Sequence, residues 1–150
     1  IVYARGISED GIILYTNYNS QKGKDLEVNP LVSLLFFYPE LERQIRIDGT
    51  IQKLPEQESD NYFNARPTES KLGAWASEQS STIESRATLE KRTEFFREKF
   101  GTEIPRPPHW GGYIVKPTKF EFWQGRPARL HDRLVFEKAV KGWSIFRIAP

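Results

Sequence analysis

The chain has 150 residues, of which 38% are hydrophobic and 28% charged, so one domain with a buried core is expected rather than a disordered chain. A net charge of +2 without a long cationic run argues against nucleic acid as a partner and fits small phosphate-bearing ligands better. The chain has no cysteine, which excludes disulfides and thiolate metal sites, and no apolar run long enough to cross a bilayer.

The first residues predict a β-hairpin. Two apolar runs, residues 1–4 and 12–16, flank residues 8–11, and the pair Asp10-Gly11 within that segment is a strong turn signal. Because the chain starts without Met and inside an apparent strand, we expect further residues to precede Ile1.

The next segments alternate between helix and strand character. Residues 20–29 are polar and predict a short helix that ends at Asn29-Pro30. Residues 31–38 form a dense apolar run, which is typical of a strand buried on both faces. From Gln44 to Gly49 polar and apolar side chains alternate, as in a half-buried strand.

Two longer helices are predicted in the middle of the chain. Pro55 can begin the first over residues 56–65. The second is expected over residues 86–100, with Ser85 as its N-cap and Gly101 at its end.

Four short strands are then predicted, and with the earlier elements they indicate the fold class. They cover residues 112–115, 120–123, 129–136 and 143–148. Many short strands with a few helices between them predict an α+β fold built on a small antiparallel barrel, with residues 1–150 as one domain.

The segment after residue 120 has the sharpest constellation of charged side chains. In an extended strand Arg129, His131 and Arg133 would project from one face, and their mutual repulsion would be relieved by a bound anion. A turn through Gly125 would bring Trp123 nearby as an aromatic surface for a planar ring. The alternative is a solvated edge strand whose charges pair with neighbouring carboxylates.

Tyr62, Arg66 and Ser70 form a second candidate site. Tyr62 and Arg66 are four residues apart, hence on one helix face, and the three polar groups could hold a phosphate monoester. The alternative is a surface arginine beside a partly buried tyrosine.

Two further polar segments are weaker candidates. Gln79-Ser80 could equally be an ordinary loop, and the strand-to-helix turn that leads from Tyr15-Thr16 to Lys22 could bind phosphate at the start of the helix. A metal centre is not expected, because the chain has only His109 and His131 and lacks any carboxylate spacing typical of one.

Taken in order, these segments resemble the pyridoxamine 5′-phosphate oxidase family. The resemblance covers the whole chain and rests on an ordered set of short motifs: Tyr15-Thr16-Asn17, Asn29-Pro30, Arg43-Gln44, Tyr62-Phe63, Arg66-Pro67, Leu72-Gly73-Ala74-Trp75, Gln79-Ser80, Trp110-Gly111-Gly112, Glu121-Phe122-Trp123-Gln124-Gly125, Arg129-Leu130-His131-Asp132-Arg133 and Ala149-Pro150. It implies a split antiparallel β-barrel with flanking helices that works as a homodimer, with FMN held at the subunit interface.

The resemblance also implies roles for individual residues. The residues expected to contact FMN are Arg5, Tyr15, Thr16, Gln21, Lys22, Gln44, Gln79, Ser80, Trp123 and Arg133. Arg5, Tyr62, Arg66 and Ser70 are expected to hold a substrate phosphate, and Arg129 and His131 to close over the pyridine ring as the residues nearest the chemistry. The family usually has Lys at the position of Arg5 and a cationic residue at that of Gln21.

The implied reaction is oxidation of pyridoxamine or pyridoxine 5′-phosphate at the 4′ carbon by oxygen, through FMN, to pyridoxal 5′-phosphate and hydrogen peroxide. A cytoplasmic enzyme is expected, without nucleic-acid or membrane partners. Two alternatives are a related FMN oxidase for another ring system, such as a phenazine precursor, and a non-catalytic protein that binds FMN or pyridoxal phosphate.

Overall fold

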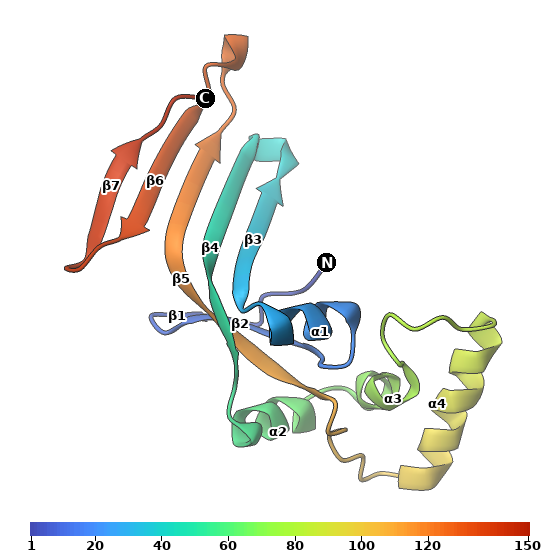
Figure 1. Ribbon diagram of the computed structural model, residues 1–150. Coiled ribbons are helices and arrows are strands. Elements are labelled where there is room, and N and C mark those ends of the chain that lie inside the picture. Colours follow the sequence, from blue (N-terminus) through green and yellow to red (C-terminus); the bar gives the residue numbers. More distant parts are fainter.

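A computed structural model describes residues 1–150 as one curled antiparallel sheet with four α-helices (Figure 1). The elements are β1 (Gly6–Ser8), β2 (Gly11–Asn17), α1 (Gln21–Val28), β3 (Leu31–Tyr38), η1 (Pro39–Leu41), β4 (Arg43–Lys53), α2 (Glu56–Asn64), α3 (Thr68–Ala76), α4 (Arg86–Phe100), β5 (Trp110–Gln124), η2 (Pro127–Arg129), β6 (Asp132–Lys138) and β7 (Trp143–Arg147). None of the helices combines the length and the apolar character needed to span a membrane.

The long strand β5 is the spine of the sheet. Along one edge it pairs with β4, whereas on the other edge residues 110–115 pair with β2 and residues 119–124 pair with β6. Between these halves the register with β4 shifts at Asp48/Gly49, so that Thr118 has no partner opposite it. Such a bulge bends a strand and increases its twist. The sheet therefore splits into two halves, which confirms the predicted α+β split barrel.

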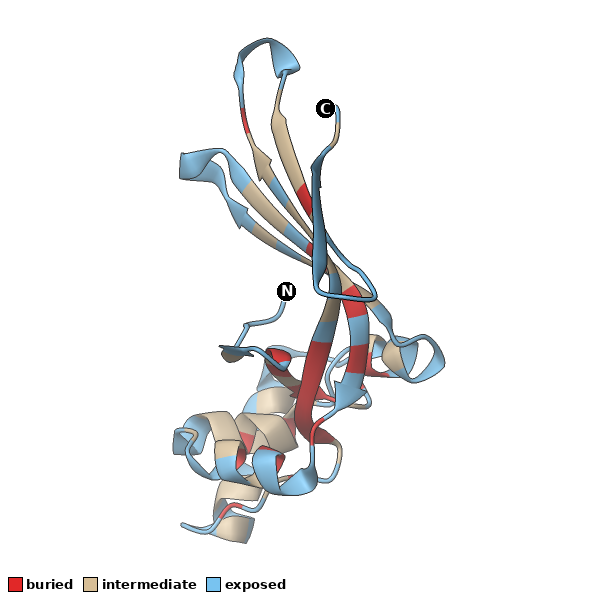
Figure 2. Ribbon diagram, turned by 90° about the vertical axis from the view of Figure 1, so that its left-hand side faces the viewer, coloured by how far each residue is buried: buried red, intermediate tan, exposed pale blue.

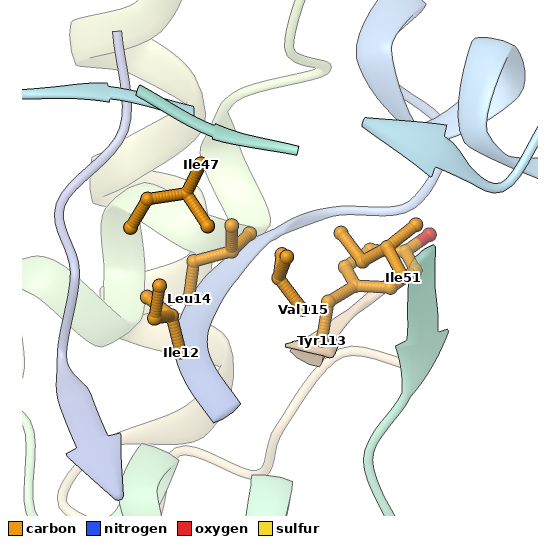
Figure 3. Close-up of a cluster of buried hydrophobic side chains, with 6 residues drawn as sticks. All are labelled: Ile12, Leu14, Ile47, Ile51, Tyr113 and Val115. Carbon is orange, nitrogen blue, oxygen red and sulfur yellow. The ribbon is translucent and has the colours of Figure 1, made fainter. Parts of the chain in front are cut away.

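The core lies in the half of the sheet that the helices flank. Ile12, Leu14, Ile47, Ile51, Tyr113 and Val115 meet there from β2, β4 and β5 (Figure 3). A second cluster joins α2, α3 and the start of β5 through Phe63, Leu72, Ile104 and Trp110. Each large apolar side chain buried in this way stabilises the fold by roughly 1.5–3 kcal/mol. Most buried residues gather in this half, whereas β3 and β7 contain none (Figure 2).

Several predicted elements are confirmed. The hairpin turn pairs Ser8 with Gly11, and α1 begins after Ser20, whose hydroxyl oxygen accepts a hydrogen bond from the N–H of Gly23 at 3.2 Å. Helices α2 and α4 lie where the sequence predicted them, although the side chain of Ser85 makes no capping bond to the backbone of α4.

Four local predictions are wrong. Residues 1–4 are not a strand, because the pairing with β2 stops at the Arg5 N–H, which donates to the Ile13 carbonyl at 2.8 Å. The expected strands 112–115 and 120–123 are one strand, since β4 pairs across the bulge without a break. Helix α3 was not predicted at all. Strand β3 is not buried on both faces: Leu35 is 62% exposed, because β3 is an edge strand with one face uncovered.

Candidate functional site

A polar cavity of about 440 Å³ lies where β2, α1, α2 and α3 meet. It is lined by the cationic side chains of Arg5, Lys22 and Arg66 and by no carboxylate. These cations are not paired with carboxylates, so they give the cavity a net positive electrostatic field. The predicted site residues that line it are Arg5, Tyr15, Thr16, Lys22, Tyr62, Arg66, Ser70 and Gln79. The arrangement favours an anionic ligand.

Arg66 is the least satisfied cation of the cavity. Its Nη1 atom is buried and has no hydrogen-bond partner, and its guanidinium carbon lies 4.5 Å from the centre of the Trp110 ring. Burial lowers the pKa of Arg66, and the nearby charge of Arg5 lowers that pKa further. Helix α2 ends at Asn64, so Arg66 lies in the turn that follows, not on a helix face with Tyr62 as predicted. Both side chains nevertheless reach the cavity.

Stacked aromatic rings form one wall. The rings of Tyr15 and Tyr62 are parallel within 5° with centroids 3.7 Å apart, and the Trp110 ring stacks with both, at 5.5 Å from Tyr15 and 6.3 Å from Tyr62. Gly112 allows this arrangement, because a Cβ atom there would lie 2.8 Å from Cε1 of Tyr15 and 2.6 Å from Cδ1 of Leu54. This stacking fixes the position of the Tyr62 phenol in the cavity wall.

A chain of hydrogen bonds links α1 to the loop after α3. The Lys22 ammonium donates to Oγ1 of Thr16 at 2.7 Å, and the Thr16 hydroxyl donates to Oε1 of Gln79 at 3.2 Å. Burial lowers the pKa of Lys22, which is not in a salt bridge. The remaining N–H groups of Lys22 can therefore donate to an anionic ligand.

A second group of predicted residues lies around the far end of β5. The Trp123 and His131 rings are 4.7 Å apart, and the Arg126 backbone N–H donates to Nδ1 of His131 at 3.1 Å. The neutral His131 ring therefore carries its proton on Nε2. Arg129 and Ala128 both have left-handed backbones, with φ of 62° and 56°. For residues other than glycine this conformation is strained.

Arg133 belongs to this second group and is held by Glu121. Its Nε atom donates to Oε1 of Glu121 at 2.7 Å and its Nη1 atom to the carbonyl of Ala149 at 3.1 Å. The hydrogen bond to Glu121 raises the pKa of Arg133 above its ordinary value. Gln44 lies opposite Trp123 in the register of β4 and β5, and together these side chains line a small hollow of about 130 Å³.

The predicted alignment of Arg129, His131 and Arg133 on one strand face is wrong. Only Arg133 lies on β6. Pro127 starts the 3₁₀ turn η2, so Arg129 and His131 come before the first residue of the strand. This turn lies at the opposite end of the molecule from α2 and α3 (Figure 1), so one chain does not bring the two groups together.

Four predicted residues line neither hollow, namely Arg129 and His131, described above, and Gln21 and Ser80. Gln21 is exposed and donates from Nε2 to Oδ1 of Asp25 at 2.8 Å, and Ser80 lies in a turn with φ of 73°. Their roles remain predictions.

Comparison with known proteins places this arrangement in a family. Residues 1–100 match the family described as pyridoxamine 5′-phosphate oxidase, and residues 110–150 match the pyridoxine 5′-phosphate oxidase C-terminal dimerisation region. The chain belongs to the pyridoxine/pyridoxamine 5′-phosphate oxidase family. Among curated relatives, the pyridoxine/pyridoxamine 5′-phosphate oxidases of Burkholderia multivorans and Burkholderia cenocepacia are 55% and 54% identical to it. Each alignment covers 100% of this chain and 72% of the relative.

Two solved structures share the architecture. PhzG from Burkholderia lata 383, in complex with tetrahydrophenazine-1-carboxylic acid, superposes with a TM-score of 0.91 at 30% identity, covering 99% of this chain and 73% of PhzG. A pyridoxamine 5′-phosphate oxidase-related, FMN binding protein from Nostoc punctiforme superposes with a TM-score of 0.74 at 15% identity, covering 99% of this chain and 79% of that one, which shows the shared fold.

Membership of the pyridoxine/pyridoxamine 5′-phosphate oxidase family supports FMN as the cofactor, and the donor set of the cavity fits this group. FMN carries a phosphate and a hydroxyl-rich chain. The cavity offers cations without competing carboxylates, and it offers hydroxyl and amide groups at Thr16, Asn17 and Gln79.

Trp110 and Asn17 are among the cavity-lining residues that were not predicted as site residues. Trp110 is 7% exposed and lies under Arg66, and Asn17 donates from Nδ2 to the Ser77 carbonyl at 3.4 Å. Both occurred in motifs that carried the family resemblance, Trp110-Gly111-Gly112 and Tyr15-Thr16-Asn17, which was the signal that could have singled them out.

Proposed function

We propose that this chain is an FMN-dependent oxidase that converts pyridoxamine and pyridoxine 5′-phosphates to pyridoxal 5′-phosphate. Oxygen is the electron acceptor and becomes hydrogen peroxide, and with the amine substrate water hydrolyses the oxidised imine and releases ammonia. The observation that carries the proposal is the buried, unpartnered Nη1 of Arg66 in a cavity with no carboxylate. A guanidinium left in this state suits a phosphate ester, which can accept several of its hydrogen bonds at once.

The substrate phosphate would bind among Arg66, Tyr62, Ser70 and Arg5, all of which line the cavity. The two guanidinium groups neutralise the dianion, and the two hydroxyls complete its hydrogen bonds. Their work is to orient the ring so that its 4′ carbon lies at a fixed place relative to the cofactor.

The FMN would be held mainly through Lys22, Thr16, Tyr15 and Gln79, which line the same cavity. When bound, FMN supplies the redox chemistry by taking a hydride from the 4′ carbon and passing electrons to oxygen. The protein contributes charge neutralisation and orientation.

The second group of residues would complete the site from a partner subunit. We place Gln44, Trp123 and Arg133 of one copy against the FMN of the other, and Arg129 and His131 over the pyridine ring. The dimerisation region matched by residues 110–150 includes all of these except Gln44, and it supports a homodimer. The exposed apolar face of β3, with Leu35 and Phe37, offers surface for such an interface.

PhzG provides a second candidate function. That protein was crystallised with a ring compound that bears a carboxylate, and a carboxylate could also pair with Arg66. Tyr62 and Ser70 add hydroxyl donors beside Arg66, which favours the larger phosphate group.

The test is an anaerobic titration of the FMN-loaded protein, followed by flavin absorbance. We expect pyridoxine 5′-phosphate to bleach the flavin, and air to restore the colour as pyridoxal phosphate appears. Bleaching only with a tetrahydrophenazine carboxylic acid would favour the second candidate. A flavin that stays oxidised with these compounds and with pyridoxamine 5′-phosphate would refute both.

A further inference from the structure

Trp110 contacts two arginines, one through its backbone carbonyl and the other through its indole ring. On one side Arg106 donates from Nη1 to the Trp110 carbonyl at 2.7 Å and forms a salt bridge with Asp60. On the other side the Arg66 guanidinium lies over the indole ring, 4.5 Å from its centre. Two donor atoms of Arg106, Nε and Nη1, are therefore occupied, whereas Nη1 of Arg66 has no partner.

The indole holds Arg66 in place without occupying its hydrogen-bond donors. An aromatic face attracts a cation through its quadrupole, so the N–H groups around the edge of the guanidinium stay available. A carboxylate at this position would also hold the arginine, but it would neutralise the charge and compete with an anionic ligand. Arg66 is in none of the salt bridges of the structure.

The same indole also supports Tyr62, another residue of the proposed phosphate site. Trp110 stacks on Tyr15 with rings 10° from parallel, and Tyr15 stacks on Tyr62. Phe63 also packs against Trp110, with ring centroids 5.2 Å apart, and this contact restricts tilting of the indole. A shift of the indole would therefore move both Arg66 and Tyr62.

We propose that Trp110 is a positioning residue that sets the preference of this site for phosphorylated over unphosphorylated ligands. It acts through Arg66 and through the Tyr15–Tyr62 stack. The proposal rests on the proposed function in one respect, namely that the anion bound at Arg66 is the phosphate of the ligand.

The test compares the dissociation constants of pyridoxal 5′-phosphate and pyridoxal, measured by equilibrium dialysis on the FMN-loaded protein. The ratio of the two constants reports the preference for phosphate. We expect Trp110→Leu to reduce this preference about tenfold and Trp110→Phe, which keeps a weaker aromatic face, about threefold. The matched control is Trp75→Leu, because Trp75 packs between α3 and α4 outside the cavity lining. We expect it to change the preference less than twofold, as for a site without direct contact to Arg66.

Several outcomes would overturn the role of Trp110. These are an equal loss of affinity for both ligands in Trp110→Leu, a loss in Trp75→Leu as large as that in Trp110→Leu, or an unchanged preference in Trp110→Phe. If Trp110→Leu does not fold, Trp110→Phe decides alone. Wild-type protein that prefers pyridoxal phosphate but never reduces its flavin would refute the proposed oxidase and leave this test intact. Turnover of the substrate together with a phosphate preference that does not change in the Trp110 variants would support the proposed oxidase and refute the role of Trp110.

Discussion

Replacing Arg66 by Met should weaken the substrate site and stabilise the free protein at the same time. Methionine keeps an unbranched side chain of similar reach but removes the guanidinium, whose Nη1 is buried without a partner. In the protein without ligand, the Arg66 charge is partly desolvated and has no hydrogen-bond partner to compensate for this. The guanidinium therefore lowers the free energy of unfolding of the free protein. A residue with a purely structural role would show the opposite change in stability.

The two magnitudes follow from different contacts. Hydrogen bonds to a charged group contribute about 1.5–3 kcal/mol, so loss of the Arg66–phosphate contact should raise the KM for pyridoxine 5′-phosphate by roughly 10- to 150-fold. The stability gain should be smaller, at most about 1 kcal/mol, because water still reaches part of the side chain. For a domain of this size that corresponds to an increase in Tm of about 2–4 °C.

The assay combines steady-state kinetics with thermal unfolding in the presence and absence of pyridoxal phosphate. The ligand should raise the Tm of the wild type, and this increase should shrink in Arg66→Met. The control is Arg86→Met on α4, where the arginine is exposed and pairs only with Glu90, so that KM and Tm should barely change. An unchanged KM, or an Arg66→Met protein less stable than wild type without ligand, would refute the assigned role.

Three further variants test the remaining charged residues. Arg129→Ala should reduce turnover far more than FMN affinity measured by flavin fluorescence, and an equal loss of both would contradict its place near the substrate. Glu121→Gln removes the ionic partner of Arg133 and should weaken FMN binding about fivefold, whereas unchanged affinity would place Arg133 away from the cofactor. Lys22→Met should stabilise the free protein at pH 7, since burial lowers the pKa of Lys22 and the unfolded state therefore binds this proton more tightly. Stability of the wild type then rises with pH between the lowered pKa and 10.5, so the advantage of Lys22→Met in urea unfolding should fade over that range. An advantage independent of pH would assign it to packing instead.

Local signals in the sequence predicted the elements whose ends depend on near neighbours. Asn29-Pro30 ends α1, Gly101 ends α4, and Asp10-Gly11 turns the first hairpin. These features act within a few residues, so their effect can be inferred without knowing the fold. Helix α3 was not predicted because its residues, which include Gly73, show little helical periodicity of apolar side chains. Its position also depends on packing against α4.

Predictions about faces and burial failed where they depended on distant partners. The apolar composition of β3 suggested burial on both sides, yet its position at the edge of the sheet leaves Leu31, Leu35 and Phe37 exposed in the single chain. The alternation of Arg129, His131 and Arg133 suggested one strand face, but the turn at Pro127 takes the first two off the strand. For β3, contacts far away in the sequence decided between the two structures that its pattern allowed, whereas for Arg129 and His131 the nearby turn at Pro127 did.

The sequence by itself determined the ends of α1 and α4, the first hairpin and the types of side chain available for binding phosphate, because these depend on local chemistry. The ordered motifs also determined the family, although no single motif was specific. Only the tertiary structure decided that Arg66 lies on Trp110 with a free donor, and that the turn η2, which contains Arg129, lies at the opposite end of the molecule from α2 and α3. The physical reason is that β5 joins residues distant in sequence and bends at Thr118, so positions along this strand are set by pairing with β2, β4 and β6 rather than by the residues next to them.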